Sequence, residues 1–501
     1  MLSQKLILNY LSKIIIQILQ VIATIVIARY AGADVLGSIT FALAYTSAFW
    51  FIADLGTGTA HMKYISENSD SADIIKTYIV IKLCLIIAYV IIVLTFFMTQ
   101  KYLFKVDFGA TETELLIYMS ICIIVLQQLV LIPNSTFAGK AEQAKQDIPS
   151  LIQNIFFQIS RIIFVLVGMG AFYLVMGHLA SVLMGALISF YLFRNYPIGI
   201  YRKDIAIKYI RTSLPILTVI VIIILMQNLD KVIIQFSNNS SEVGIYAVGY
   251  RFGGFILSFS DTVNLLLFPI FTSAFKRDDY AFVFDIVRKY EKLCLAFGLP
   301  LIILIIMLSK DILLLLVGNS FIGSVATMQI LLLASFIMLL SIPYYNILNG
   351  KSLFKLTSQL YFIGFLIFLL FSFILVGPFV LNFGATGMAI CLLLNNLFLF
   401  VMFRIKSFGI MKFNNKLFFI PYFILSLFIF SIYLVITNLQ YFSHSWDLLV
   451  GFVLFFLLLA AFRLFKLFEK EDFIYLNSVL KVNLLTEYIK TELTGSRKRK
   501  K

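Results

Sequence analysis

The sequence predicts an all-α, polytopic membrane protein of about 14 transmembrane helices, built as two pseudo-symmetric six-helix lobes plus two extra C-terminal helices. Hydrophobic residues make up 61% of the 501 residues and charged residues only 13%, whereas soluble domains are roughly 45–50% apolar and about 25% charged. The apolar residues also form runs of about 20 residues or more, enough to cross ~30 Å of hydrocarbon as helices. A soluble core needs no such runs.

Fourteen apolar segments can be delimited along the chain. The join between the fifth and sixth rests on Gly168 and Gly170, which indicate a turn inside the region 148–193. A single helix there would invert the topology of everything that follows. The predicted spans are 6–28, 35–60, 77–99, 113–138, 148–169, 171–193, 212–236, 243–272, 293–309, 323–349, 356–377, 380–403, 417–438 and 446–462.

The distribution of Lys and Arg supports this count and gives the orientation. With the N-terminus in the cytoplasm, 32 of the 40 Lys and Arg residues fall on the cytoplasmic side, Lys13 near the start of the first span included, and 4 in outer loops. Cytoplasmic loops of membrane proteins carry such an excess, so both termini are predicted to be cytoplasmic. The residues responsible for the net charge of +15 thus lie mainly in the loops on one side of the membrane. This distribution does not indicate a nucleic-acid partner.

An internal repeat becomes visible when the chain is compared with itself at an offset of 207 residues. Gly37 then falls on Gly244 and Asp54 on Asp261, so that the first two spans match the seventh and eighth. Parallel repeats of this kind build two lobes with a substrate cleft between them. We therefore predict a first lobe over 1–211, a second over 212–405, an extra helix pair over 406–465 and a basic cytoplasmic tail over 466–501. The tail either lies on an anionic leaflet or is solvated, and the sequence leaves both open.

Short motifs are distributed along the chain: ARYAG at 28–32, LG at 36–37, FIADLG at 51–56, LDKVII at 229–234, EVGIYA at 242–247, NGK at 349–351 and FGATG at 383–387. With these motifs the sequence resembles the polysaccharide flippases (O-antigen type) of the multidrug/oligosaccharidyl-lipid/polysaccharide exporter superfamily. The resemblance covers most of the chain before about residue 466.

This resemblance implies a carrier rather than an enzyme. Such a carrier flips a polyprenyl-diphosphate-linked oligosaccharide across the cytoplasmic membrane by alternating access, for surface polysaccharide assembly. Its partners would be the lipid-linked oligosaccharide, membrane lipids, a coupling proton or sodium ion, and polysaccharide polymerase machinery.

Cations inside the predicted spans are candidate substrate-binding residues. A charged side chain at the centre of a membrane helix costs ~2.5–3.5 kcal/mol and usually faces the protein interior. A guanidinium binds phosphate oxygens in a bidentate manner, so Arg161 and Arg251 are predicted to bind a diphosphate. Lys231 and Arg29 are further candidates.

Carboxylates inside the spans are candidate ion-coupling residues. Asp54 and Asp261 occupy matching positions of the repeat, in the cytoplasmic halves of their spans, where they could carry a proton or sodium ion. Two alternatives stay open: structural hydrogen bonds to neighbouring helices, or ion pairs with the two arginines. Lys82 is expected to extend to the interface, and the adjacent Asp230 and Lys231 to point to different faces of their helix.

Catalytic, cofactor and metal sites find no support in the sequence. The four cysteines lie in apolar runs without metal-ligand spacing, and the three histidines lie at the edges of loops. Tyr345 stands where a phosphate-binding loop ending in Gly350-Lys351-Ser352 needs its first glycine. No cofactor is predicted. The alternatives to a flippase are a multidrug exporter of the same superfamily and a membrane glycan polymerase or ligase, although no outer loop is long enough for the latter.

Overall fold

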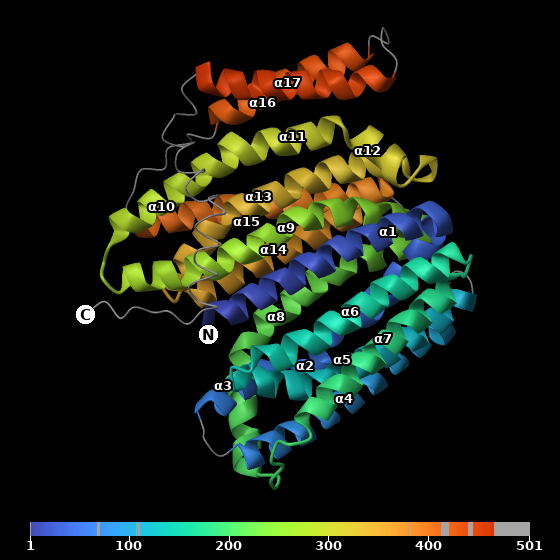
Figure 1. Ribbon diagram of the computed structural model, residues 1–501, viewed down its shortest axis with the longest axis vertical. Coiled ribbons are helices and arrows are strands. Elements are labelled where there is room, and N and C mark those ends of the chain that lie inside the picture. The colour runs from blue at the N-terminus through green and yellow to red at the C-terminus, as the bar shows by residue number, and fades with distance from the viewer. Residues whose placement is uncertain are drawn as a thin grey trace. The chain divides into compact units, whose positions relative to one another are not determined.

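The computed structural model describes residues 2–67, 71–106, 108, 111–378, 380–411, 420–438 and 444–464. These residues form helices joined by turns, with no strand among them (Figure 1). Ten of the helices that can be searched in this part of the chain are long and apolar enough to cross a membrane. The predicted all-α, polytopic fold is confirmed, whereas the number of fourteen spans stays a prediction.

The elements follow one another along the chain with short connections. The first part contains α1 (Leu2–Ser47), α2 (Trp50–Asp54), α3 (Thr57–Glu67), α4 (Ala72–Met98), α5 (Thr111–Gly139), α6 (Gln143–Leu166), α7 (Ala171–Phe193) and α8 (Lys203–Ser237). The second contains α9 (Ser240–Phe275), α10 (Tyr280–Leu293), α11 (Leu299–Met307), α12 (Ser309–Leu316), α13 (Ser324–Gly350), α14 (Phe354–Leu375), α15 (Gly384–Met411), α16 (Ile420–Asn438) and α17 (His444–Leu464).

Two glycines in the left-handed region mark boundaries between predicted spans. Gly32 has φ 84° and kinks α1, so that this helix holds the first span and the start of the second, which α2 and α3 complete. Gly168 has φ 81° and lies in the turn between α6 and α7. The region 148–193 is therefore two helices, as predicted, because only glycine adopts this backbone at little cost.

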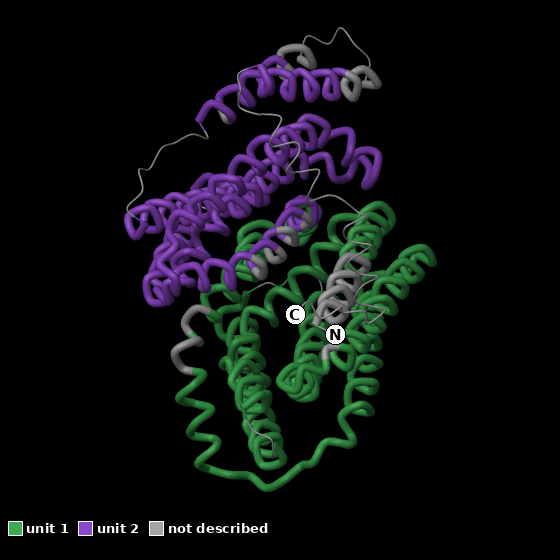
Figure 2. Tube along the Cα trace, turned by 60° about the vertical axis from the view of Figure 1, so that its left-hand side comes forward, with its two compact units in different colours: residues 1–247 green, residues 248–501 purple. Residues whose placement is uncertain are grey.

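Packing divides the chain into two compact units, Met1–Ala247 and Val248–Lys501 (Figure 2). In unit 1, α7 packs against α5 and α6, while α1 packs against α5, α6 and α8. The predicted lobe boundary at 211/212 was placed by topology and stays a prediction. In the compact unit 1, α8 and the first turns of α9 belong with α1–α7.

Unit 2 is organised around α15, which packs against α13 and α14. The extra pair α16 and α17 packs together and against α11 (Figure 1). Close contact is possible there because Gly451 faces Leu308 without a side chain of its own. The predicted basic tail 466–501 lies outside the described residues.

One face of α6 shows how these helices meet the bilayer. Ile152, Phe156, Ile159 and Ile163 are exposed, at the spacing of one helical face. The opposite face buries polar side chains, Arg161 among them. An apolar outer stripe and a polar inner face are expected of a membrane helix that lines a protein interior.

Candidate functional site

The carboxylate of Asp54 is bound to a lysine inside unit 1. Asp54 is the last residue of α2, and its Oδ1 accepts a hydrogen bond of 2.7 Å from Lys82 Nζ on α4. The Lys82 side chain is 0% exposed. The expectation that Lys82 extends to the interface is therefore wrong: it lies about 15 Å along α4 from Ala72, and a buried ammonium needs a counter-ion.

Three side-chain oxygen atoms lie close to the position that a Cβ atom would occupy at Gly58. A Cβ there would lie 3.3 Å from Asp54 Oδ1, 3.4 Å from Ser135 Oγ and 3.6 Å from the Tyr78 hydroxyl. The Tyr78 hydroxyl is buried. Any cation that binds Asp54 would have to share the carboxylate with Lys82, which cannot reach water. A coupling role for Asp54 therefore requires Lys82 to move or to lose its proton, and this role stays a prediction.

The predicted arginine of α6 lies in a polar and aromatic setting. Arg161 is 9% exposed; its Nη1 donates to Gln158 Oε1 at 3.2 Å, and its guanidinium lies 5.0 Å from the centroid of the Phe157 ring. Phe157 in turn stacks on His178 of α7 at 4.1 Å. The guanidinium is thus held away from lipid, as a binding residue must be, but a structural role fits the same contacts.

Lys231 and Asp230 on α8 form an ion pair with each other. Lys231 Nζ lies 2.9 Å from both Asp230 carboxylate oxygens and donates to the Gln227 carbonyl at 2.6 Å. Tyr246 on α9 donates to Asp230 Oδ2 at 2.8 Å. The expectation that these two side chains point to different faces is wrong, because the long lysine chain bends back to the buried carboxylate.

The remaining predicted residues are distributed over two helices. Arg29 is exposed on α1, three residues before the Gly32 kink. Arg251 is half-buried in α9, within unit 2. Asp261 lies on the same helix, but its side chain is outside the described residues. The structure thus places the candidate cations on α1, α6, α8 and α9, and gives Arg161 and Lys231 separate partners.

A polar contact joins α3 to the first turns of α8. His61 is fully buried; its Nδ1 lies 2.6 Å from the Tyr209 hydroxyl and its Nε2 lies 2.9 Å from Thr136 Oγ1. Next to it, the Tyr64 hydroxyl lies 2.6 Å from Thr212 Oγ1. Burial lowers the pKa of His61, just beyond the end of the predicted span, to about 3. A neutral ring donates one of these hydrogen bonds and accepts the other, so that His61 bridges α8 and α5.

A second contact, made by glycines, joins α1 to the start of α9. A Cβ on Gly37 would lie 1.6 Å from the Ser240 carbonyl oxygen, and one on Gly244 would lie 2.1 Å from that of Ala33. Both pairs are related by the 207-residue offset, since Ala33 corresponds to Ser240 and Gly37 to Gly244. A contact in which residue i meets j and j meets i is characteristic of two-fold symmetry. This reciprocity supports the predicted repeat.

Unit 2 contains a buried ionic network that sequence reasoning missed. Arg404 of α15 donates from Nη1 to the Glu291 carboxylate of α10 and to the Tyr344 hydroxyl of α13, and Tyr344 donates to Glu291. Both charged side chains are 3% exposed. Arg404 directly follows the predicted span 380–403, yet it lies within α15 and its side chain is buried. The sequence did not indicate this pair, because Arg404 follows a long apolar run. Glu291 lies in an amphipathic segment with charged neighbours, a pattern typical of a solvent-exposed helix.

This network predicts a clear pattern of stability changes. Arg404→Leu or Glu291→Leu should each destabilise the protein by ~3–5 kcal/mol, because the remaining charge is buried without its partner. The double variant should recover much of that loss. Thermal unfolding of the purified protein in detergent measures all three. Additive losses in the double variant would contradict a stabilising pair.

No group of three or more metal-ligating side chains occurs among the described residues.

A family model described as "Polysaccharide biosynthesis protein" matches residues 2–275. The chain belongs to this family. The matched region contains α1–α9, and so includes the contacts of Asp54, Arg161 and Lys231.

Two solved structures have the same fold as this polysaccharide biosynthesis family member. The lipid II flippase MurJ, in an inward closed conformation, has a TM-score of 0.67 at 15% identity, and the match covers 91% of this chain and 98% of MurJ. An inward-facing multidrug resistance MATE family transporter of the MOP superfamily has a TM-score of 0.66 at 12% identity, covering 80% and 96%. At these identities the likeness shows the fold alone. A search of curated protein sequences finds no significant match.

Proposed function

We propose that this protein flips a polyprenyl-diphosphate-linked oligosaccharide from the cytoplasmic to the outer leaflet by alternating access, as a step of surface polysaccharide assembly. The observation that carries the proposal is the match of the polysaccharide biosynthesis family model over 2–275. The fold shared with a lipid II flippase over 98% of that chain agrees with it. The substrate head group would be an anion, which suits a protein with buried cations.

Two other functions are weighed against this one. The fold is shared with MATE transporters, so multidrug export is the second candidate, although the family model favours the flippase. A glycan polymerase or ligase would be an enzyme and would need a catalytic site. The proposed protein is instead a carrier, without cofactor, that hands its product to polymerase machinery.

A proteoliposome assay separates these functions. The purified protein is reconstituted with a fluorescent polyprenyl diphosphate sugar, and a membrane-impermeant enzyme that modifies the sugar reports its transfer between leaflets. The flippase should raise the accessible fraction from about half to nearly all, because both leaflets exchange. Empty liposomes and the cationic dye ethidium, as a probe of drug transport, serve as controls. Ethidium transport without sugar transfer would favour the multidrug exporter.

The proposed orientation places the N- and C-termini in the cytoplasm, in a cytoplasmic membrane. A topology reporter fused after Lys203 is expected to read as cytoplasmic and one at Asn239 as external, because α8 lies between them. An alkaline phosphatase and fluorescent protein pair measures both sides. Equal sidedness at the two sites would show that α8 does not cross the bilayer.

A further inference from the structure

The connection between α7 and α8 exposes an unusual number of large apolar side chains. Ile198 is 56% exposed, Ile200 70%, Ile207 44% and Ile210 56%. The first two lie in the extended stretch before α8, and the other two on the outer face of its first turns. The inner face of the same turns buries Ala206 and Tyr209. Exposed apolar groups of this kind mark a surface that meets another apolar phase.

The backbone of this connection is fixed against the start of α4. The Gly199 amide donates to the Ala72 carbonyl at 3.0 Å, and the Ile200 amide to Asp73 Oδ1 at 3.0 Å. The Arg202 amide donates to Thr77 Oγ1 at 3.1 Å. The isoleucines are therefore held outward by a defined structure.

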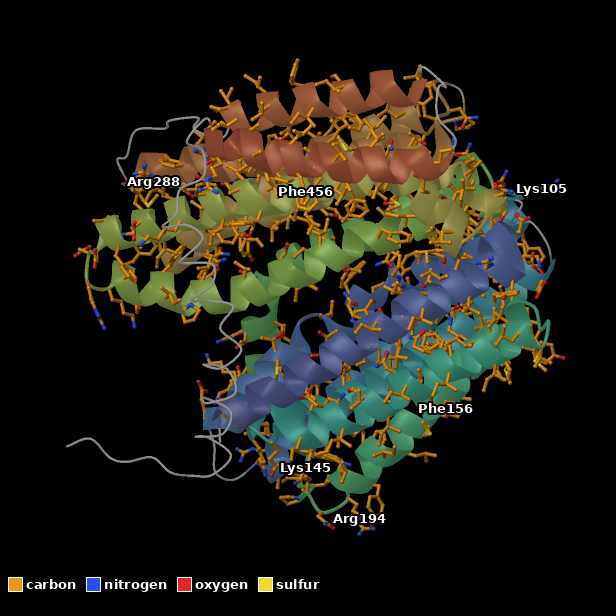
Figure 3. The ribbon with its side chains drawn as sticks, turned by 45° about the horizontal axis from the view of Figure 1, so that its top comes forward. Lys105, Lys145, Phe156, Arg194, Arg288 and Phe456 are labelled. Carbon is orange, nitrogen blue, oxygen red and sulfur yellow. The ribbon has the colours of Figure 1, made fainter. Side chains whose placement is uncertain are left out.

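Cations are interleaved with these isoleucines. Lys203, Lys208 and Arg211 are exposed on the same turns of α8, and Arg194 ends α7. The nearby acids are already engaged, since Asp204 accepts from Arg202 at 3.2 Å and Asp73 lies 3.9 Å from the same arginine. In Figure 3, Arg194 and Lys145 lie at one end of the helices of unit 1, and Lys105 lies at the opposite end. The surface is therefore both apolar and strongly positive.

We infer that the segment 194–211 is a binding surface for anionic phospholipids of the cytoplasmic leaflet. The membrane helix α7 ends and α8 begins here, so the segment lies at the level of the lipid head groups. Isoleucines of its outward face enter the acyl boundary, while lysine and arginine side chains bind lipid phosphates, the arrangement of an interfacial amphipathic segment. An anionic phospholipid offers a phosphate to the cations and acyl chains to the isoleucines. An acidic cytoplasmic protein would bind the cations and leave the isoleucines beside the bilayer without a partner surface.

The inference is tested by lipid titration of the full-length protein in zwitterionic detergent. Binding of dioctanoyl phosphatidylglycerol and of dioctanoyl phosphatidylcholine is followed by native mass spectrometry and by thermal stability. Phosphatidylglycerol should bind more tightly, and the preference should fall as salt rises. In Lys208→Gln/Arg211→Gln the affinity for phosphatidylglycerol should fall about thirtyfold, while that for phosphatidylcholine should not change.

A matched control removes two cations from outer segments, Lys105→Gln/Lys310→Gln. This variant should keep the lipid preference. Equal binding of the two lipids by the unmodified protein, or an equal loss in the control variant, would overturn the inference. The salt dependence of the unmodified protein tests the inference even where the double variant folds poorly, since a salt-independent preference also contradicts binding through these cations.

Discussion

A disulfide between residues 56 and 213 is expected to stop transport completely and reversibly. A Cβ on Gly56 would lie 3.7 Å from the Ser213 Cβ, within the ~3.5–4.5 Å that disulfides span. Gly56 lies between α2 and α3 in the predicted first lobe, and Ser213 lies on α8 at the start of the second. Alternating access requires these lobes to part at one end of the cleft at a time, so a covalent bond there should hold that end closed.

The experiment begins from a variant in which the four native cysteines are replaced. Gly56→Cys/Ser213→Cys is then assayed for sugar transfer after oxidation and again after reduction. The backbone φ of 76° at Gly56 costs a substituted residue about 1 kcal/mol, so Gly56→Cys alone controls for this strain. Oxidation should abolish transfer, and a reductant should restore it.

The matched control pair joins two helices of the same predicted lobe. A Cβ on Gly185 of α7 would lie 3.0 Å from the Gln153 Cβ of α6, so Gln153→Cys/Gly185→Cys should also form a disulfide after a small adjustment. Transfer should continue in that variant. A crosslinked 56–213 protein that transfers sugar at the normal rate would show that this contact does not open during transport.

The two ends of the α8 region are held by different chemistry. His61 and Tyr64 reach α8 through hydroxyl and imidazole hydrogen bonds, whereas Gly37 and Gly244 bring backbones together without side chains. Hydrogen-bonding groups can exchange their protein partners for water at modest net cost. Closely packed backbones instead separate only by losing contact along both helices. This difference indicates that the polar contact at α3 is the easier one to open.

Most of the fold could be predicted because a membrane makes strong demands on sequence. Each span must be apolar over its length, and a turn between two spans needs a residue such as Gly168, whose positive φ the structure confirms. Gly37 and Gly244, on which the predicted repeat rests, lie at a close helix contact, where only small residues fit. These features are local, so the sequence displays them directly.

The partners of charged residues could not be predicted in the same way. From the sequence, Lys82 is expected near the end of a helix and Arg404 near the loop that follows one. Whether these side chains are buried depends on which helices pack beside them. Asp54 lies 28 residues from Lys82 along the chain, and Glu291 lies 113 from Arg404. Pairing over such separations is a property of the tertiary fold, and no short motif records it.

Reversing the charge of Arg161 or Arg251 is expected to abolish sugar transfer while leaving the protein inserted and abundant. An anionic head group that crosses a low-dielectric region needs cationic partners, and each charged hydrogen bond contributes ~1.5–3 kcal/mol, or more than tenfold in affinity. Arg161→Glu and Arg251→Glu are measured in the proteoliposome assay, with protein level followed by immunoblot. Arg288→Glu, which alters an exposed cation of α10, is the matched control and should transfer sugar normally.

Substitution by lysine and alanine separates binding from structural roles for the same two residues. Arg161→Lys and Arg251→Lys should keep part of the transfer, since the charge remains but the bidentate fork is lost. Normal transfer by both Arg161→Ala and Arg251→Ala would place the anion elsewhere, with Lys231 and Arg29 the next candidates. A loss of folded protein in Arg161→Ala, instead of a loss of transfer, would assign Arg161 to the structural contacts with Gln158 and Phe157 that the fold already provides.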